Sequence, residues 1–288
     1  MIPDNDWYGH KYILSLYCGR PQATAIFGSV MHGWRPELDN AGHRRVTSAP
    51  LFVWNEMLVA DAVKAGVPNV RAIGAPFLYL VELLSQSGPS PTGKGTLCFP
   101  FHSAERIIVE QDHRRLIDHV EATEPGPYSV SIFYQDLRRP EYRKAYEEAG
   151  WRIVSFGDRS DPLFLFRLYA ELLCHQVVIA DQLGTSVWYA GALGRRVRVS
   201  PDPPTGFQDG RPYPVTKLAS RFPALHNEGL EPQAAQEEAF LQLGRPSMLS
   251  PFALSESLGW QSRKRFYAFA IGTLIDRRIG DRTRLGDP

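Results

Sequence analysis

Residues 177–200 are the stretch that most constrains the fold of this chain. A short apolar run, Val177–Ala180, is followed by a polar turn and then by a helix-like block from Val187 to Leu193, which a glycine ends. A second apolar run begins at Val197. This order of strand, loop, helix and strand is typical of a parallel α/β sheet. It places the polar turn, 181–186, at the carboxyl end of a strand, where such sheets bind ligands.

Two interpretations of this polar turn are open. Free backbone N–H groups at Gly184, together with the hydroxyls of Thr185 and Ser186, suit a phosphate group. Alternatively, Thr185 or Ser186 only caps the following helix. The segment by itself favours the cap, but its place among other polar loops of the same predicted sheet edge favours the phosphate.

Alternating strand and helix patterns on the N-terminal side of this segment predict a parallel α/β architecture. We expect strands at 23–28, 51–55, 70–74, 95–100, 128–134 and 151–156. We expect helices at 56–64, 77–84, 112–122, 139–150, 162–173, 233–244, 251–259 and 263–279. A stretch rich in Ser, Pro and Gly, 85–94, reads as a linker, and 201–214 reads as a loop.

The linker divides the predicted fold into two Rossmann-like domains that face each other across a cleft. The first is a short domain over residues 1–90, and the second covers residues 91–205. Residues 206–288 form a mostly helical C-terminal region. We expect its helices to pack on the sheets or to cross back to the first domain.

Composition excludes several classes of function. The 288 residues carry a net charge of +1, so nothing predicts nucleic acid as a partner. The three cysteines lie far apart without metal-ligand spacing, which indicates reduced thiols in the cytoplasm. No signal peptide and no membrane-spanning run is recognisable. We expect no metal site, because no pair of carboxylates follows a predicted strand. We also expect no cofactor.

Polar residues follow several of the predicted strands. His32 stands at one strand end and could act as a general base, or it could simply bond a neighbouring loop. His102 and Ser103 follow the next domain's first strand and could bind phosphate, although Ser103 could equally be a helix cap. Gly157 and Asp158 could hold a base through main-chain groups, or form an ordinary turn.

The two ends of the chain carry further candidates. The N-terminus is polar and aromatic, and its aromatic pair predicts that it packs, so Asp6 or His10 could line the cleft. The last expected helix, 263–279, has an apolar centre with basic flanks. It could lie on an anionic membrane surface, or pack on the body of the protein with a solvated basic rim.

Five short motifs together resemble glycosyltransferases of the two-Rossmann-domain type, GT-B, as found in bacterial surface-polysaccharide gene clusters. They are also distantly similar to the polymerases that transfer glycerol phosphate from its CDP ester to teichoic acid. The motifs are Met31-His32-Gly33-Trp34, Trp54-Asn55-Glu56, Ile73–Tyr79, Phe99–Ser103 and Asp181–Tyr189.

The resemblance implies an inverting, metal-independent enzyme that transfers a sugar or polyol phosphate from a nucleotide-activated donor to a glycan or lipid-linked acceptor. It implies His32 as the general base, because the teichoic-acid enzymes carry their base in an HG motif. The implied donor-binding residues are His102, Ser103, Gly157, Asp158, Gly184, Thr185 and Ser186. The implied acceptor-side residues are Asp6, His10, Trp34 and Asn55.

Two alternative functions stay open on the sequence. One is a sugar-nucleotide epimerase of the same architecture, although few acidic residues occupy the expected cleft loops. The other is a non-catalytic binding subunit, which the short first domain favours. In each case we expect a cytoplasmic protein, which could bind the inner face of the plasma membrane.

Overall fold

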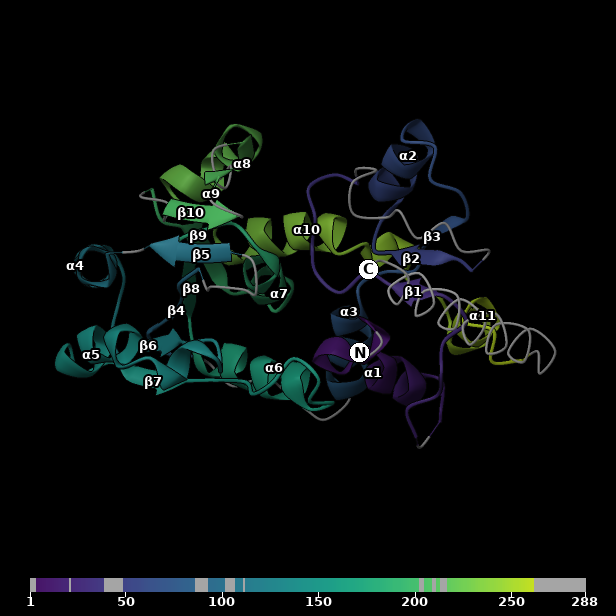
Figure 1. The fold of residues 1–288 in the computed structure, drawn as a ribbon, viewed down its shortest axis with the longest axis horizontal. Helices are drawn as coiled ribbons and strands as arrows, with labels where there is room; N and C mark the ends of the chain where they lie inside the picture. The colour runs from purple at the N-terminus through teal and green to yellow at the C-terminus, as the bar shows by residue number, and fades with distance from the viewer. Residues whose placement is uncertain are drawn as a thin grey trace, which may run out of the picture.

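The computed structural model describes residues 4–20, 22–38, 49–85, 93–101, 107–110, 112–201, 205–208, 211–212 and 217–261. It shows a mixed α/β fold with two parallel sheets, which we call the N-terminal sheet (β1–β3) and the large sheet (β4 and β6–β9). Figure 1 shows the two sheets on opposite sides of the molecule, with helices α3, α7 and α10 between them. The expected α/β class is therefore confirmed.

The N-terminal sheet has the strand order β1-β2-β3, and all its strands are parallel. Its strands are β1 (Ser29–Val30), β2 (Leu51–Val53) and β3 (Val70–Ala72). The helices of this half are η1 (Asp4–Gly9), α1 (His10–Tyr17), α2 (Glu56–Lys64) and α3 (Pro76–Ser85). The predicted strands and helices between 51 and 84 are thus confirmed within a few residues.

The strand expected at 23–28 is wrong, because the first strand begins only at Ser29. The preceding backbone finds partners outside any sheet. Thr24 N–H donates to Ser15 Oγ at 2.9 Å, and Phe27 N–H donates to the Leu258 carbonyl at 3.0 Å. These bonds to α1 and to the C-terminal region satisfy polar groups that a strand would otherwise pair.

The large sheet has the order β7-β6-β4-β8-β9 and is parallel throughout. Its strands are β4 (Thr96–Phe99), β6 (Tyr128–Ser131), β7 (Arg152–Val154), β8 (Val177–Ala180) and β9 (Arg196–Val199). The helices of this half are α4 (His113–Thr123), η2 (Asp136–Arg138), α5 (Pro140–Glu148), α6 (Phe164–Cys174) and α7 (Thr185–Ala192). All five expected strands are present. The chain order reverses direction between β4 and β8, which makes this a topological switch point.

A third, antiparallel sheet pairs segments that are distant in the sequence. It consists of β5 (Ile107–Glu110), β10 (Thr205–Gln208) and β11 (Arg211–Pro212), in the order β11-β10-β5. The expectation of a loop over 201–214 is therefore wrong at β10 and β11. Pairing of Ile107 with Gln208 joins residues about a hundred positions apart, which a local pattern does not reveal.

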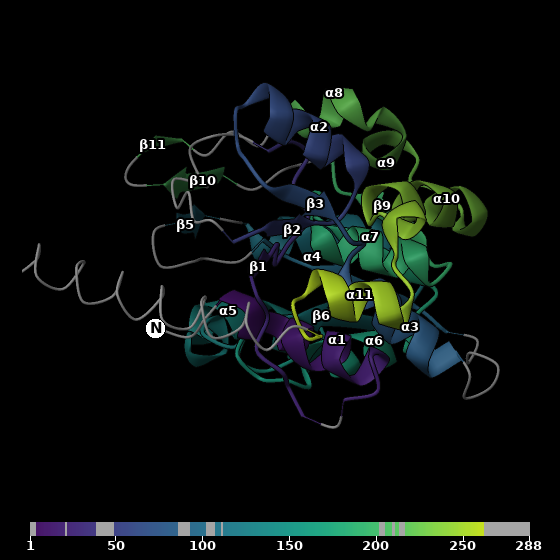
Figure 2. The same ribbon diagram turned by 90° about the vertical axis from the view of Figure 1, so that its right-hand side faces the viewer.

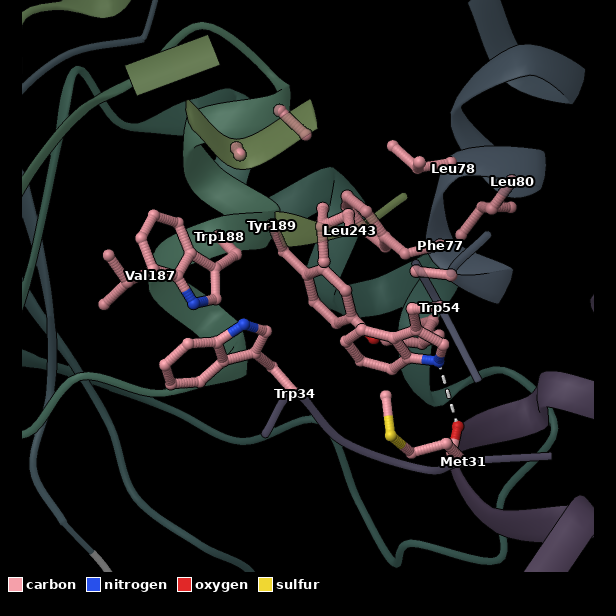
Figure 3. Close-up of a cluster of buried hydrophobic side chains, with 14 of the residues drawn as sticks. Met31, Trp34, Trp54, Phe77, Leu78, Leu80, Val187, Trp188, Tyr189 and Leu243 are labelled. Atoms are coloured by element: carbon pink, nitrogen blue, oxygen red, sulfur yellow. Dashed lines mark hydrogen bonds between the residues drawn. The ribbon is translucent and has the colours of Figure 1, made fainter. Parts of the chain in front are cut away.

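One continuous cluster of buried apolar side chains joins the two parallel sheets. Trp54 from the N-terminal sheet and Trp188 from α7 are fully buried in it, as is Phe77 at the start of α3. Figure 3 shows these side chains with Trp34 and Tyr189, and the bond from Trp54 Nε1 to the Met31 carbonyl, 3.1 Å long. Removing such an aromatic side chain costs about 3–5 kcal/mol. The halves therefore share a core.

The C-terminal helices are α8 (Lys217–Arg221), α9 (Pro223–Asn227), α10 (Pro232–Gln242), η3 (Arg245–Ser247) and α11 (Pro251–Ser257). They begin beside the large sheet, where α9 and α10 pack on β9 and α7, and then run back to the N-terminal half. Helix α10 packs closely on α7, because a Cβ at Gly191 would stand 2.8 Å from the Ala235 carbonyl oxygen. Figure 2 shows α11 beside α1 and α3. The expected helix over 263–279 and most of the expected linker, 86–92, lie outside the described residues.

Candidate functional site

The carboxyl ends of β4 and β8 meet at the switch point of the large sheet. Asp181, the first residue after β8, is buried, and its Oδ2 accepts a hydrogen bond from Phe101 N–H, beyond β4, at 2.8 Å. Burial first, and then the Asp181 charge, raise the pKa of the neighbouring Cys98 thiol well above its ordinary value. Asp181 therefore shapes the loops at the point where open α/β sheets place their ligands.

The loop after β8 ends at the N-terminus of α7. Gly184 is the N-cap, with an extended backbone, and Thr185 and Ser186 are the first two helical residues. The interpretation of Thr185 or Ser186 as the N-cap is therefore wrong. As a glycine, Gly184 brings no side chain that could cap this helix. The first N–H groups of a helix have no partner within the helix and carry partial positive charge, so they can bind an anion.

The segment that carries His32 lies against this helix end. Trp34 N–H donates to Thr185 Oγ1 at 2.9 Å, and a Cβ on Gly33 would stand 3.4 Å from the same oxygen. A hydroxyl that accepts one bond still holds its own proton for donation. The carboxyl end of β1 and the N-terminus of α7 therefore belong to one place, which we call the junction site.

Residues from the N-terminal element complete the junction site around His32. The Trp7 ring lies edge-on to the His32 ring, with centroids 4.5 Å apart, and the Arg159 guanidinium stands 4.3 Å from the Trp7 centroid. Tyr8 N–H donates to the Arg159 carbonyl at 2.5 Å. The element η1 thus connects the candidate base to the loop after β7.

Asp158 lies in that loop, at the tip of the large sheet. Its Oδ1 accepts from Ser160 N–H at 2.7 Å and from the Ser160 hydroxyl at 2.6 Å. These bonds, with another from the Tyr134 hydroxyl, lower the pKa of Asp158 to about 2. Gly157 holds a left-handed φ of 88°, which lets the chain turn here. Asp158 is therefore an ionised carboxylate whose hydrogen bonds stabilise its own turn. The Tyr134 hydroxyl lies beside it.

His10, the first residue of α1, lies near enough to His32 to feel its charge. Its side chain is fully buried, and burial, followed by the nearby His32, lowers the pKa of His10 to about 3. Neither ring nitrogen has a hydrogen-bond partner among the described residues. The imidazole is thus neutral at physiological pH and has polar atoms that the fold itself leaves unpaired.

The remaining predicted residues have structural partners or are not described. Asp6 forms an ion pair with Lys11. Trp34 Nε1 donates to Gln242 Oε1 at 3.0 Å, and Asn55 Nδ2 donates to the Gln242 carbonyl at 2.8 Å, while Asn55 Oδ1 caps α2. Both side chains are buried among α10 and the aromatic core. His102 and Ser103 lie outside the described residues.

Sequence reasoning missed two phenols of this region, Tyr8 and Tyr134. Both lie near Asp158, whose charge contributes to raising the pKa of each: burial is the largest cause for Tyr8, and the hydrogen bond to Asp158 is the largest for Tyr134. A signal for Tyr134 was present, because it follows β6 in the same way as the other candidates follow their strands. For Tyr8 the aromatic pair at the N-terminus predicted packing but not a place near Asp158, because that place depends on a left-handed φ of 58°.

No family model matches the chain, and no curated protein matches it. Within the described ranges, no three His, Cys, Asp or Glu side chains are grouped so that they could hold a metal ion. In the same part of the chain, no helix combines the length and the apolar character that crossing a bilayer requires.

Proposed function

We propose that the protein transfers a sugar or a polyol phosphate from a nucleotide-activated donor to a hydroxyl group of a glycan or lipid-linked acceptor. The observation that carries this proposal is the 2.9 Å bond between Trp34 N–H and Thr185 Oγ1. It joins the candidate base segment of one parallel sheet to the candidate diphosphate end of the other.

The donor would lie on the large sheet in this proposal. A leaving nucleoside diphosphate gains negative charge as its bond breaks, and the N-terminus of α7 offers unpaired N–H groups toward such charge. Thr185 and Ser186 would add hydroxyl donors, and Gly184 lets the chain approach closely. The loop with Gly157 and Asp158 would border the base, beside the Tyr134 ring.

The acceptor would approach His32 from the N-terminal half. Imidazole is the side chain that most often takes the proton of an attacking hydroxyl in catalysis near neutral pH. His10 lies close enough to His32 for the two to repel each other when charged. Trp7 and Arg159 would form the rim over which the acceptor enters. The GT-B-like arrangement of two facing halves is part of this proposal.

Nucleotide binding tests the proposal first. We expect one of CDP, UDP or GDP to raise the melting temperature of the full chain. Ser186→Ala should weaken that nucleotide about tenfold, since one hydrogen bond to a charged group is lost. Thr185→Ser keeps the hydroxyl and should bind normally. Ser250→Ala, at the N-cap of α11, is the matched control. The absence of stabilisation by every nucleotide would contradict the proposal.

Catalysis is tested with esters of the nucleotide found in this way. Sugar and polyol-phosphate esters are incubated with a glycan acceptor, and released nucleotide is measured. His32→Gln should abolish release while leaving the binding of nucleotide unchanged. If a bound ester is isomerised without an acceptor, the protein is an epimerase and the transferase proposal is wrong. If nucleotide binds and no ester reacts, the protein is a binding subunit.

A further inference from the structure

The large sheet has a second, smaller apolar core on the face that α4 and α5 cover, away from the core that the two halves share. Over this second core, where β4 and β6 end, lies a half-open cavity, which we call the outer cavity. With its mouth included it holds about 220 Å³ of empty space, and its closed part has room for about one water-sized group. None of the described residues that line it belongs to the junction site, so the two places are separate.

Rings form most of the described wall of the outer cavity. They belong to Phe101, His113, Phe133, Tyr142 and Tyr146. The rings of His113 and Tyr142 have centroids 5.1 Å apart, and His113 Nδ1 is 3.0 Å from the Tyr146 hydroxyl. The Arg139 guanidinium carbon lies over the Tyr142 ring, 5.4 Å from its centroid. Because the faces of aromatic rings carry partial negative charge, such a wall favours cations over anions.

A buried carboxylate, that of Asp136, also lines the outer cavity. Asp136 is the first residue of η2, and its N–H donates to the Phe133 carbonyl at 2.9 Å. Its own carbonyl accepts from Arg139 N–H at 2.9 Å, so the backbone is fixed on both sides of the carboxylate. A buried carboxylate is stabilised by a cation that enters beside it.

Burial keeps two other polar groups of the wall uncharged. It lowers the pKa of His113 below its ordinary value of 6.5, which the Asp112 charge only partly offsets. Burial first, and then the neighbouring Cys98 and Asp181, raise the pKa of Tyr146 well above its ordinary value. At neutral pH, His113 is therefore a neutral imidazole and Tyr146 keeps its phenolic proton. The effect of Asp181 also shows that a second carboxylate acts on this place.

The size and the charge of the outer cavity together select its ligand. A primary ammonium group is about as large as a water molecule and donates three hydrogen bonds. Asp136 and Ser131 bring oxygen acceptors to the cavity. A trimethylammonium group is too large for the closed part, and a phosphate would add negative charge beside Asp136. A neutral hydroxyl fits in size, but its bond to a carboxylate is weaker than that of a charged donor.

We propose that the outer cavity binds the primary ammonium group of a small molecule, through the carboxylate of Asp136 and the rings around it. The half-open mouth leaves the rest of that molecule in solvent. Amino alcohols and amino sugars are compounds that carry such a group. This site goes beyond the proposed transfer reaction and does not depend on it.

Selective labelling of the eight histidines with ¹⁵N follows ligand entry through the His113 ring in the full chain. Methylammonium chloride is the probe, and because so small a ligand binds with a millimolar dissociation constant at best, the titration runs to about 100 mM. We expect a saturable shift of the His113 ring nitrogens, and none with methanol, tetramethylammonium chloride or potassium chloride. The absence of a saturable shift with methylammonium, or an equal shift with any of the other three, would overturn the proposal.

Variants assign the signal and supply a matched control. His113→Phe identifies the His113 signals by their loss. Asp136→Asn keeps the size of the side chain and should weaken methylammonium at least about tenfold, since a bond between charged partners is lost. Asp112→Asn makes the same change at the exposed N-cap of α4, beside His113, and should stay within about threefold of the unaltered chain. Equal weakening in both variants would contradict the proposal, and the titration of the unaltered chain decides it even if Asp136→Asn does not fold.

Larger amines identify the carrier of the ammonium group. Ethanolamine is compared with ethylene glycol, and glucosamine with glucose, in the same labelled samples. A response to glucosamine but not to glucose supports an amino sugar as the ligand, whereas a response to ethanolamine alone supports a small amine. A response to neither amine would overturn the proposal, because the mouth of the cavity would then not admit a molecule larger than the probe.

Discussion

Thr185 shows how a single hydroxyl can serve both the fold and a ligand. Its oxygen fixes the Trp34 backbone at 2.9 Å and its proton stays free to donate. The side chains of Trp34 and Asn55 differ in this respect. Gln242 accepts a hydrogen bond from each of them, so these contacts hold the fold together. The polar residues near the junction site thus form two groups. Trp34 and Asn55 use side-chain hydrogen bonds to hold the fold, whereas Thr185 keeps a donor for a ligand.

The buried His10 predicts how stability depends on pH. Its folded pKa, about 3, lies below the ordinary value of about 6.5, so the unfolded chain binds the extra proton in between. The contribution is complete above about pH 6.5 and is lost as pH falls, by about 1.4 kcal/mol per pH unit. Urea unfolding between pH 7 and pH 4 measures this slope.

The same measurement on His10→Phe isolates the share of His10. Lowered pKa values of His113 and His175 add slopes of the same sign, and both remain in the variant. We expect the pH dependence of the variant to be flatter by about one proton. Equal slopes in the two proteins would show that His10 is not buried as described.

At the scale of elements, local patterns predicted the parallel strands and their helices. The apolar residues of such an element recur every two to four positions, so a short stretch of sequence is enough to reveal it. The strand at 23–28 failed since its polar groups bond to α1 and to Leu258, far away in the sequence. In the candidate site, the rule for strand ends places polar candidates at the carboxyl ends of the strands of one sheet. It does not predict the bond between Trp34 and Thr185, because β1 and β8 belong to different sheets. Nor does it predict the roles of Trp34 and Asn55, because Gln242 lies 208 and 187 residues away.

The connection between η1 and α1 predicts a large effect at one glycine. Gly9→Ala puts a Cβ 2.1 Å from the Pro162 oxygen, whereas Gly66 has a similar φ of 69° with nothing within 4 Å of a Cβ. Gly66→Ala should cost about 1 kcal/mol for its left-handed backbone. Gly9→Ala should cost at least about 2 kcal/mol more, since backbone must move. Chemical denaturation compares them, and equal losses would contradict the described packing.

At the scale of the whole molecule, the shared core predicts cooperative unfolding. Trp54 and Trp188 belong to one apolar cluster that includes residues from both parallel sheets. Tryptophan fluorescence and far-ultraviolet circular dichroism should therefore give the same urea midpoint and the same slope. Two separate transitions would show that the halves unfold independently and that the aromatic contacts contribute little.

The aromatic packing between the sheets also has a consequence for protein engineering. Chimeric proteins are made by exchanging one half of a fold for the corresponding half of another protein. Here the exchange would have to match Trp34, Trp54, Trp188 and Tyr189 in shape as well as the backbone bond to Thr185. A half produced alone would expose these rings to water and invite aggregation. The junction site is therefore better altered by changing the loops around His32 and Asp158 than by recombining halves.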